Sequence, residues 1–206
     1  MVSTHLDELE LRLPELKQCR GDIELGFAAM CDAYYADGKV LLCGNGGSAA
    51  DADHWAGELL KGFRKKRELS LADAARLPAH LAEHLQRPLA AVPLTGFNAL
   101  SSAFANDVAP DLVFAQLVWG LGKPGDVFVG ISTSGNARNV CAAAQAAQAR
   151  GLKTVGLTGA TGGALKPLCD IAICAPARET HLVQEYHLPI YHCLSMMLED
   201  EFFPDC

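Results

Sequence analysis

The chain has 206 residues, of which 50% are hydrophobic and 7% aromatic, and it carries a formal net charge of −7. This length fits one α/β domain with helical extensions. The negative charge argues against a nucleic-acid partner, because such binding depends on Lys and Arg neutralising phosphates. No apolar run approaches the roughly 20 residues that span a bilayer, and the acidic N-terminal residues lack the pattern of a signal peptide. We therefore expect a cytoplasmic protein that contacts neither nucleic acid nor membrane.

Helical patterns fill the first 37 residues. Residues 3–12 form a short pattern that ends before Pro14, and apolar residues then recur every three or four positions from Leu16 to Tyr34. This apolar stripe is wide for a helix that covers one edge of a small domain. It either covers the chain's own sheet or packs on a second subunit, and the sequence leaves both open.

The next residues predict a strand, a tight turn and a helix. The apolar run 39–43 leads into Gly44-Asn45-Gly46-Gly47-Ser48, and an Ala-rich segment follows. The glycines allow positive φ angles and close approach of a ligand, while Ser48 can cap the helix or donate to a phosphate oxygen. The segment is a candidate anion-binding loop, although similar turns without a ligand recur in α/β folds.

A second loop of the same kind follows a predicted strand at 126–131. Ser132-Thr133-Ser134-Gly135-Asn136 places three hydroxyl groups at the carboxyl end of that strand, before an Ala-rich helix that extends to about residue 149. Solvated turns also collect Ser, Thr, Gly and Asn. Two such loops in one small domain nevertheless favour a phosphate site.

The segment 64–88 links the first helix to the second strand and is rich in charge. Its four basic residues, Arg64-Lys65-Lys66-Arg67, are predicted to form a solvated face on a connector. Ser70 is predicted to be an N-cap, and Pro78 interrupts the pattern, so one or two short surface helices are expected.

The remaining elements complete an α/β fold. Strands are predicted at 89–94, 154–157 and 171–174, and helices at about 98–105, 111–121 and 179–203, the last kinked at Pro189. The alternation predicts a three-layer, doubly wound sandwich with a five-stranded, mostly parallel sheet. We expect one domain over residues 1–206, with 1–37 as an N-terminal helical extension and 38–206 as the core with its C-terminal helix. Ligands of such sheets lie beyond the carboxyl ends of the strands.

His54 and Glu58 lie at positions i and i+4, so both project from one face of the helix that begins at the first loop. One or two turns along that helix lie about 8–12 Å from a bound anion. Ketose–aldose isomerisation needs a base, an acid and a group that polarises the carbonyl. Glu58 and His192 could supply them. The alternatives are an exposed helix pair for His54 and Glu58 and a core histidine for His192.

Together these residues resemble the sugar isomerase (SIS) domain family. The two loops resemble the domain family as a whole, while His54, Glu58, Asn106-Asp107, Gln184-Glu185 and His192 resemble its phosphoheptose isomerase branch. The similarity runs from about Val40 to Phe203. It implies a flavodoxin-like strand order and the interconversion of sedoheptulose 7-phosphate and D-glycero-D-manno-heptose 7-phosphate.

The resemblance also implies roles for individual residues. Glu58 would remove the C1 proton of the sugar, and His192 would act as acid or move protons between the oxygens. Asn106-Asp107 without this context would be a helix-ending turn. The implied substrate-binding residues are Asn45, Gly46, Gly47, Ser48, Asp107, Ser132, Thr133, Ser134, Asn136 and Gln184.

A metal and an assembly follow from the same resemblance. Some phosphoheptose isomerases carry zinc on residues that match His54, Glu58, Gln184 and His192, a set of two imidazoles, a carboxylate and an amide oxygen. A metal-free acid/base site made of the same residues is the alternative. The resemblance further implies a homotetramer in which subunits complete each other's sites.

Three departures leave the exact sugar phosphate open. Ala137 stands where a further serine is expected, His181 stands where an acidic residue is expected, and segment 64–88 is longer than the corresponding link. The alternatives are an isomerase for a five- or six-carbon sugar phosphate and a non-catalytic regulator similar to the protein that binds the bacterial replication initiator. The regulator branch lacks the glutamate and histidine of the isomerase site, and both are present here.

Overall fold

The computed structural model of the chain describes residues 2–204 and is built around a five-stranded parallel sheet. The strands are β1 (Val40–Cys43), β2 (Ala91–Pro93), β3 (Val127–Ser132), β4 (Lys153–Thr158) and β5 (Ile171–Cys174). Their order is β2-β1-β3-β4-β5, and every pair is parallel. The flavodoxin-like order is therefore confirmed. The strand order reverses at β1, which lies between β2 and β3, and ligands of open α/β sheets bind at such a switch point.

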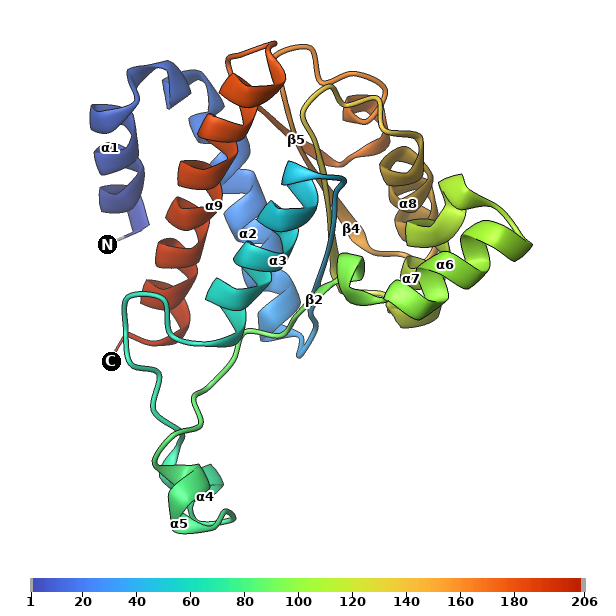
Figure 1. The fold of residues 1–206 in the computed structure, drawn as a ribbon. Coiled ribbons are helices and arrows are strands. Elements are labelled where there is room, and N and C mark those ends of the chain that lie inside the picture. The colour runs from blue at the N-terminus through green and yellow to red at the C-terminus, as the bar shows by residue number, and fades with distance from the viewer. Residues whose placement is uncertain (1, 205–206) are drawn as a thin grey trace.

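Helices cover both faces of this sheet, which confirms the three-layer sandwich (Figure 1). One face carries α2 (Arg20–Tyr35), α3 (Gly47–Leu60) and α9 (Thr180–Phe202), and the other carries α7 (Val113–Leu121) and α8 (Arg138–Ala149). Side chains alternate along each strand. Thus Val40 and Leu42 of β1 pack in the first core, and Leu41 and Cys43 pack in the second.

The N-terminal helices pack on their own chain. Helix α1 (Val2–Arg12) lies beside α9, and a 3₁₀ segment (Pro14–Cys19) precedes α2, so the expected long helix is divided. Leu16, Ile23 and Met30 of the apolar stripe are buried in the first core. Of the two alternatives for this stripe, the structure shows that it covers the chain's own sheet. The stripe therefore gives no support to a subunit interface.

The remaining helices and strands lie close to their predicted ranges, whereas the 3₁₀ turns that join them were not predicted. Helix α6 (Asn98–Asp107) and the 3₁₀ turns Leu94–Gly96 and Pro110–Leu112 connect β2 to α7, and a 3₁₀ turn at Lys166–Leu168 precedes β5. Helix α9 continues through Pro189 from Thr180 to Phe202. Within the described residues no helix is long and apolar enough to cross a membrane.

The segment 64–88 forms an arm that projects from the body (Figure 1). It carries two one-turn helices, α4 (Leu71–Ala74) and α5 (Ala79–Ala82), neither of which contains a buried residue. The Ser70 hydroxyl accepts a hydrogen bond from the Asp73 amide at 3.1 Å, so the predicted N-cap is confirmed. A bridge between Glu68 and Gln86 joins the two sides of the arm at its base.

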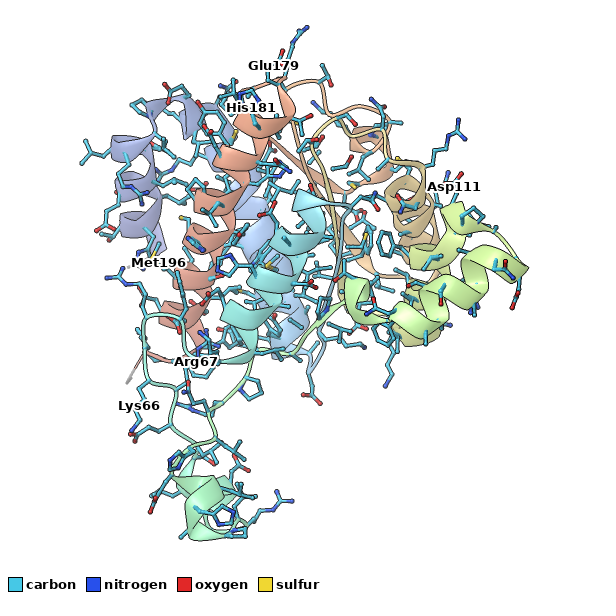
Figure 2. The ribbon with its side chains drawn as sticks, in the orientation of Figure 1. Lys66, Arg67, Asp111, Glu179, His181 and Met196 are labelled. Atoms are coloured by element: carbon cyan, nitrogen blue, oxygen red, sulfur yellow. The ribbon has the colours of Figure 1, made fainter. Side chains whose placement is uncertain are left out.

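The prediction that residues 64–67 form a solvated face is wrong for Arg67. Its side chain is 0% exposed and is paired with Glu199 of α9. In Figure 2, Arg67 lies under the ends of α3 and α9, whereas Lys66 lies on the outer side of the arm. The sequence pattern missed this because a charge run shows no partner 132 residues away along the chain.

Candidate active site

The first loop has a backbone that only glycine can adopt at two positions. A Cβ at Gly44 would lie 2.4 Å from the Ser48 carbonyl oxygen, and Gly46 has a φ of 55°. The Ser48 and Ala49 amides bond back to Asn45 and Gly46, which starts α3 directly at the loop. The N-terminus of this helix, with its positive dipole end, therefore faces the carboxyl edge of the sheet, as an anion site requires.

The second loop is braced against the one that follows β4. Gly135 has a φ of 68°, and a Cβ there would lie 2.1 Å from the Gly162 carbonyl oxygen. The Asn136 side chain donates to the Ser134 carbonyl at 3.1 Å and accepts from the Ala164 amide at 3.0 Å. Asn136 thus holds the loop in shape, in addition to any contact with substrate, and leaves the exposed Ser134 and half-buried Thr133 at its rim.

The structure brings the two loops together. Strands β1 and β3 pair so that Cys43 lies opposite Gly130, and the side chains of Asn45 and Asn139 exchange hydrogen bonds of 2.9 and 2.8 Å. Gln184 of α9 lies over the first loop, because a Cβ on Gly47 would be 2.1 Å from its side-chain nitrogen. Asn45, Gly46, Gly47, Ser48, Ser132, Thr133, Ser134, Asn136 and Gln184 therefore occupy one edge of the sheet.

Among the described residues, no interaction joins Asp107 to the two loops at this edge. It ends α6, where its carboxylate accepts a hydrogen bond from Asn106 at 2.8 Å. The helix-ending position matches the alternative that the sequence left open for this pair. His181, the departure noted above, is exposed in the first turn of α9, at the end of that helix near Glu179 (Figure 2).

The acid/base candidates lie further along α3 and α9. Nε2 of His54 is 3.1 Å from Oε1 of Glu58, and the rings of His54 and His192 have centroids 5.3 Å apart at an interplanar angle of 89°. Phe63 packs against His192 with centroids 5.0 Å apart. The Glu58 side chain is only 12% exposed, and Lys61 lies 3.6 Å from its second oxygen. The base and acid expected from the sequence are thus neighbours, from two different helices.

The surroundings keep His192 neutral near pH 7. Burial, followed by the nearby His54, lowers the pKa of His192, and the Glu58 charge opposes this shift. Nε2 of His192 and Oε2 of Glu58 are buried and make no hydrogen bond within the described part of the chain. A neutral imidazole can both accept and donate a proton, which is what transfer between two sugar oxygens requires.

The proposed zinc ligands do not converge within one chain. The described residues contain no group of three or more His, Cys, Asp or Glu side chains that could hold a metal ion. Gln184 lies at the first loop, whereas His192 lies beside His54 and Glu58, about 12 Å further along α9 by the rise of a helix. The donor atoms of these four residues suit zinc, but Gln184 lies at the opposite end of the site from the other three.

Four residues that sequence reasoning missed lie around His54 and its neighbour His192. The Tyr191 hydroxyl is 3.0 Å from Nδ1 of His54 and 3.3 Å from Oδ1 of Asp51, and its ring stacks on Trp55. Phe63 is the fourth. Asp51, His54 and Glu58 follow the i, i+3, i+7 spacing of one helix face, so the sequence could have placed Asp51 beside His54. No sequence pattern links Tyr191 to α3.

The strand order and the paired loops at the switch point define a SIS-domain protein. A sequence profile described as "SIS domain" matches residues 100–198. Phosphoheptose isomerase of Nitratiruptor sp. is 43% identical over 164 residues, which covers 80% of this chain and 78% of that protein. The corresponding protein of Thiobacillus denitrificans is 42% identical over 175 residues, or 84% and 79% of the two chains. The chain belongs to the phosphoheptose isomerase family.

Solved structures agree with this assignment. The structure of phosphoheptose isomerase from Neisseria gonorrhoeae is similar with a TM-score of 0.76 at 32% identity, covering 97% of each chain. That of a phosphoheptose isomerase from Francisella tularensis has a TM-score of 0.74 at 30% identity, covering 95% of this chain and 98% of its own. The resemblance seen in the sequence is confirmed over almost the whole fold.

Proposed function

We propose that this protein is a ketose–aldose isomerase that converts sedoheptulose 7-phosphate to D-glycero-D-manno-heptose 7-phosphate. The observation that carries the proposal is the contact of His54 with both Glu58 and His192, on a helix that begins at a phosphate-type loop. The relatives named phosphoheptose isomerase support the seven-carbon substrate. Glu58 and His192, the two residues that the regulator branch lacks, are both present in this chain.

The chemistry follows from the positions of these groups. The Ser48 end of α3 and the hydroxyls of Ser132, Thr133 and Ser134 bind the phosphate. Glu58 takes a proton from C1 while the C2 carbonyl oxygen gains one, which gives the enediol. Glu58 then returns a proton to C2 while the C1 oxygen loses its hydrogen. His192, which is neutral, moves the proton between the two oxygens.

A panel of substrates tests this function. The purified protein is incubated with sedoheptulose 7-phosphate and with five- and six-carbon ketose phosphates, and products are identified by NMR. The proposal predicts the fastest turnover with the seven-carbon compound. Faster turnover of a five- or six-carbon phosphate would mean that this shorter compound is the substrate. Binding of a sugar phosphate without turnover would favour the non-catalytic regulator.

We further propose that the protein is a homotetramer, located in the cytoplasm, whose sites are completed across subunits. Ser48 and Glu58 are ten residues apart on α3, about 15 Å along its axis. This separation exceeds the 8–12 Å expected from the sequence. A seven-carbon phosphate spans about 10 Å, from eight bonds of about 1.5 Å. A substrate whose phosphate is bound at Ser48 would therefore not reach Glu58 of the same α3, and we propose that it reaches Glu58 of a second copy.

Mixed subunits test the shared site. Glu58→Gln and Ser134→Ala chains, each weakly active alone, are denatured together and refolded. If one substrate uses the loops of one copy and the Glu58 of another, the mixture regains part of the wild-type activity. Activity no higher than the sum of the two variants would show that each site lies within one chain. A monomer mass by light scattering at micromolar concentration would also rule out the tetramer.

We propose that zinc binds at His54, Glu58, Gln184 and His192, with the set completed by donors from more than one copy of the chain. Such an ion would polarise the substrate's carbonyl oxygen as a Lewis acid. Metal content is measured by mass spectrometry on protein purified without a His tag, together with activity after chelation. Sub-stoichiometric zinc with full activity in chelator would leave the metal-free alternative.

A further inference from the structure

Asn45 is the only residue between Gly44 and Ser48 that carries a side chain. Glycine leaves the backbone of a loop unusually free, and ordering such a loop costs conformational entropy. Asn45 is therefore the one side chain in this stretch through which the rest of the protein can hold the first loop. Although it is exposed, it makes two hydrogen bonds with Asn139 of α8, the helix that follows the second loop.

Helices α3 and α8 both begin without a capping side chain. Their N-cap residues are Gly46 and Ala137, and neither makes a side-chain hydrogen bond to its helix. The first amides of a helix have no partner within it, so they stay available to an anion. One of them is used, because the Val140 amide donates to Oδ1 of Asn139 at 3.0 Å. Asn139 thus does for α8 what the Ala137 side chain cannot do.

The Val140 amide also fixes the orientation of the Asn139 side chain. An N–H donates only to an acceptor, so Oδ1 rather than Nδ2 of Asn139 must lie against Val140. The same Oδ1 accepts from Nδ2 of Asn45 at 2.9 Å, and Nδ2 of Asn139 donates back to Oδ1 of Asn45 at 2.8 Å. A backbone group of α8 therefore sets the orientation of the Asn45 amide. Nδ2 of Asn45 carries two hydrogens, and the second one remains for a ligand.

We propose that Asn139 is a positioning residue that holds Asn45, and with it the first loop, at a fixed distance from the second loop before the substrate binds. Neither asparagine titrates, and neither is among the proposed zinc ligands. This inference deepens the proposed substrate site and rests on the proposed function for its effect on catalysis. The amide pair itself does not depend on that function.

A loop that is ordered in advance reduces the entropy that binding must lose. Without Asn139, the substrate would have to order the first loop itself, so the affinity for substrate would fall. The proton-transfer step at Glu58 takes place on another part of α3 and would be unaffected. The expected kinetic signature of losing Asn139 is therefore a higher KM at nearly constant kcat.

The amide pair is tested first in the ligand-free protein, by NMR measurement of hydrogen exchange at the side chains of ¹⁵N-labelled asparagine. The Asn45 signals are assigned from their loss in Asn45→Ala. One Nδ2 hydrogen of Asn45 is expected to exchange more slowly in the wild type than in Asn139→Ala, because its hydrogen bond protects it. Equal exchange in the two proteins would overturn the proposal, whatever the substrate is.

A double-mutant cycle then shows whether Asn139 acts through Asn45. Calorimetric titration with sedoheptulose 7-phosphate compares the wild type, Asn45→Ala, Asn139→Ala and the double variant. Asn139→Ala is expected to weaken binding by about tenfold, the equivalent of one hydrogen bond. It should have no further effect once Asn45 is replaced by alanine. Additive losses would mean that Asn139 acts independently of Asn45, which would contradict the proposal.

Two further variants separate positioning from capping. Asn139→Ser keeps a hydroxyl oxygen for the Val140 amide but is too short to reach Asn45, so it should match Asn139→Ala and replaces it if that variant folds poorly. Wild-type affinity in Asn139→Ser would show that Asn139 only caps α8. Gln148→Ala is the matched control, since Gln148 is an exposed amide near the other end of α8, and it should change neither exchange nor affinity.

Steady-state kinetics complete the test. Both Asn139 variants are expected to raise KM by about tenfold while kcat stays within about twofold of the wild-type value. A lower kcat at unchanged KM would contradict a role in binding. Failure of the wild type to convert sedoheptulose 7-phosphate would overturn the proposed function, whereas the exchange of the Asn45 hydrogens would still decide whether Asn139 holds the loop.

Discussion

Glu199 of α9 and Arg67 at the base of the arm form a buried ion pair, with Oε1 and Nε 2.8 Å apart and side chains 1% and 0% exposed. The Glu199 carboxylate also accepts hydrogen bonds from the Phe63 and Arg64 amides, at 2.7 and 2.8 Å. The pair therefore fastens the turn that follows α3 to the last helix, and with it the Phe63 ring that packs on His192.

The same arginine caps α3, the helix that carries the proposed base Glu58. Arg67 donates to the carbonyl oxygens of Leu59 at 2.7 Å and of Glu58 at 3.1 Å. The last carbonyls of a helix have no partner within it, so this guanidinium satisfies two of them. The backbone of Glu58 is thereby held at a defined place relative to α9.

Replacing Glu199 by Gln is expected to destabilise the protein by about 3–5 kcal/mol, because the Arg67 charge would stay buried without its counter-charge. Urea unfolding followed by circular dichroism measures the change. Glu185→Gln, an exposed change on the same helix, is the control and should alter the free energy of unfolding by less than about 0.5 kcal/mol. Equal effects of the two variants would contradict the role assigned to the ion pair.

His187 should make the fold sensitive to acid. It is 0% exposed on α9, and burial lowers its pKa from 6.5 to about 4, although a contact with the Thr158 carbonyl opposes the shift. Between these values the unfolded chain binds a proton and the folded chain does not. The stability present above pH 6.5 is therefore lost as the pH falls toward 4, by up to about 3 kcal/mol.

Urea unfolding of the wild type and His187→Gln at pH 7.5 and pH 4.5 checks this prediction. The variant should lose less stability between the two pH values than the wild type does. His84→Gln, in the exposed arm, should follow the wild type. An equal loss in His187→Gln would mean that other groups cause the acid sensitivity.

Ser134→Ala should weaken phosphate-ester binding by about 1–3 kcal/mol, the usual effect of losing a hydrogen bond to a charged group. The structure gives Ser134 a second role, since its hydroxyl accepts from the Asn136 amide at 3.2 Å. Calorimetric titration with substrate and with inorganic phosphate measures the change. Ser102→Ala on α6 is the control, and equal affinity of both variants for substrate would remove Ser134 from the site.

The outer part of the arm should be dispensable for stability. No residue between Arg67 and Leu89 is buried, and the Glu68–Gln86 bridge already joins the two sides. Replacing residues 70–84 with a two-residue turn should change the free energy of unfolding by less than about 1 kcal/mol, because no core contact is lost. A larger loss in urea unfolding would show that the arm supports the body.

The sheet and its helices could be predicted from the sequence because their signals are local. Apolar runs such as Val40–Cys43 and turn residues such as those at 44–48 specify strand, loop and helix within a few neighbours. The order of the strands came from the resemblance. Where local signals are mixed, as at Pro14–Cys19, a 3₁₀ segment replaced the predicted start of the helix.

The acid/base pair could be anticipated, but its support could not. His54 and Glu58 are neighbours by helix geometry, whereas Tyr191 reaches His54 only because α9 folds back across α3. Arg67 was assigned to solvent for the same reason, since its partner Glu199 is distant in sequence. Contacts between helices depend on the packed fold, and a single sequence does not display them.

The most direct test of the central claim is isomerisation of sedoheptulose 7-phosphate in deuterium oxide, followed by NMR. Proton transfer through an enediol, with Glu58 as base, predicts an aldose product that carries deuterium at C2. It also predicts that Glu58→Gln lowers the rate by about 10²–10⁴-fold, as expected for loss of a general base, while circular dichroism still shows a folded protein. No conversion by the wild type, or wild-type turnover by Glu58→Gln, would contradict the account.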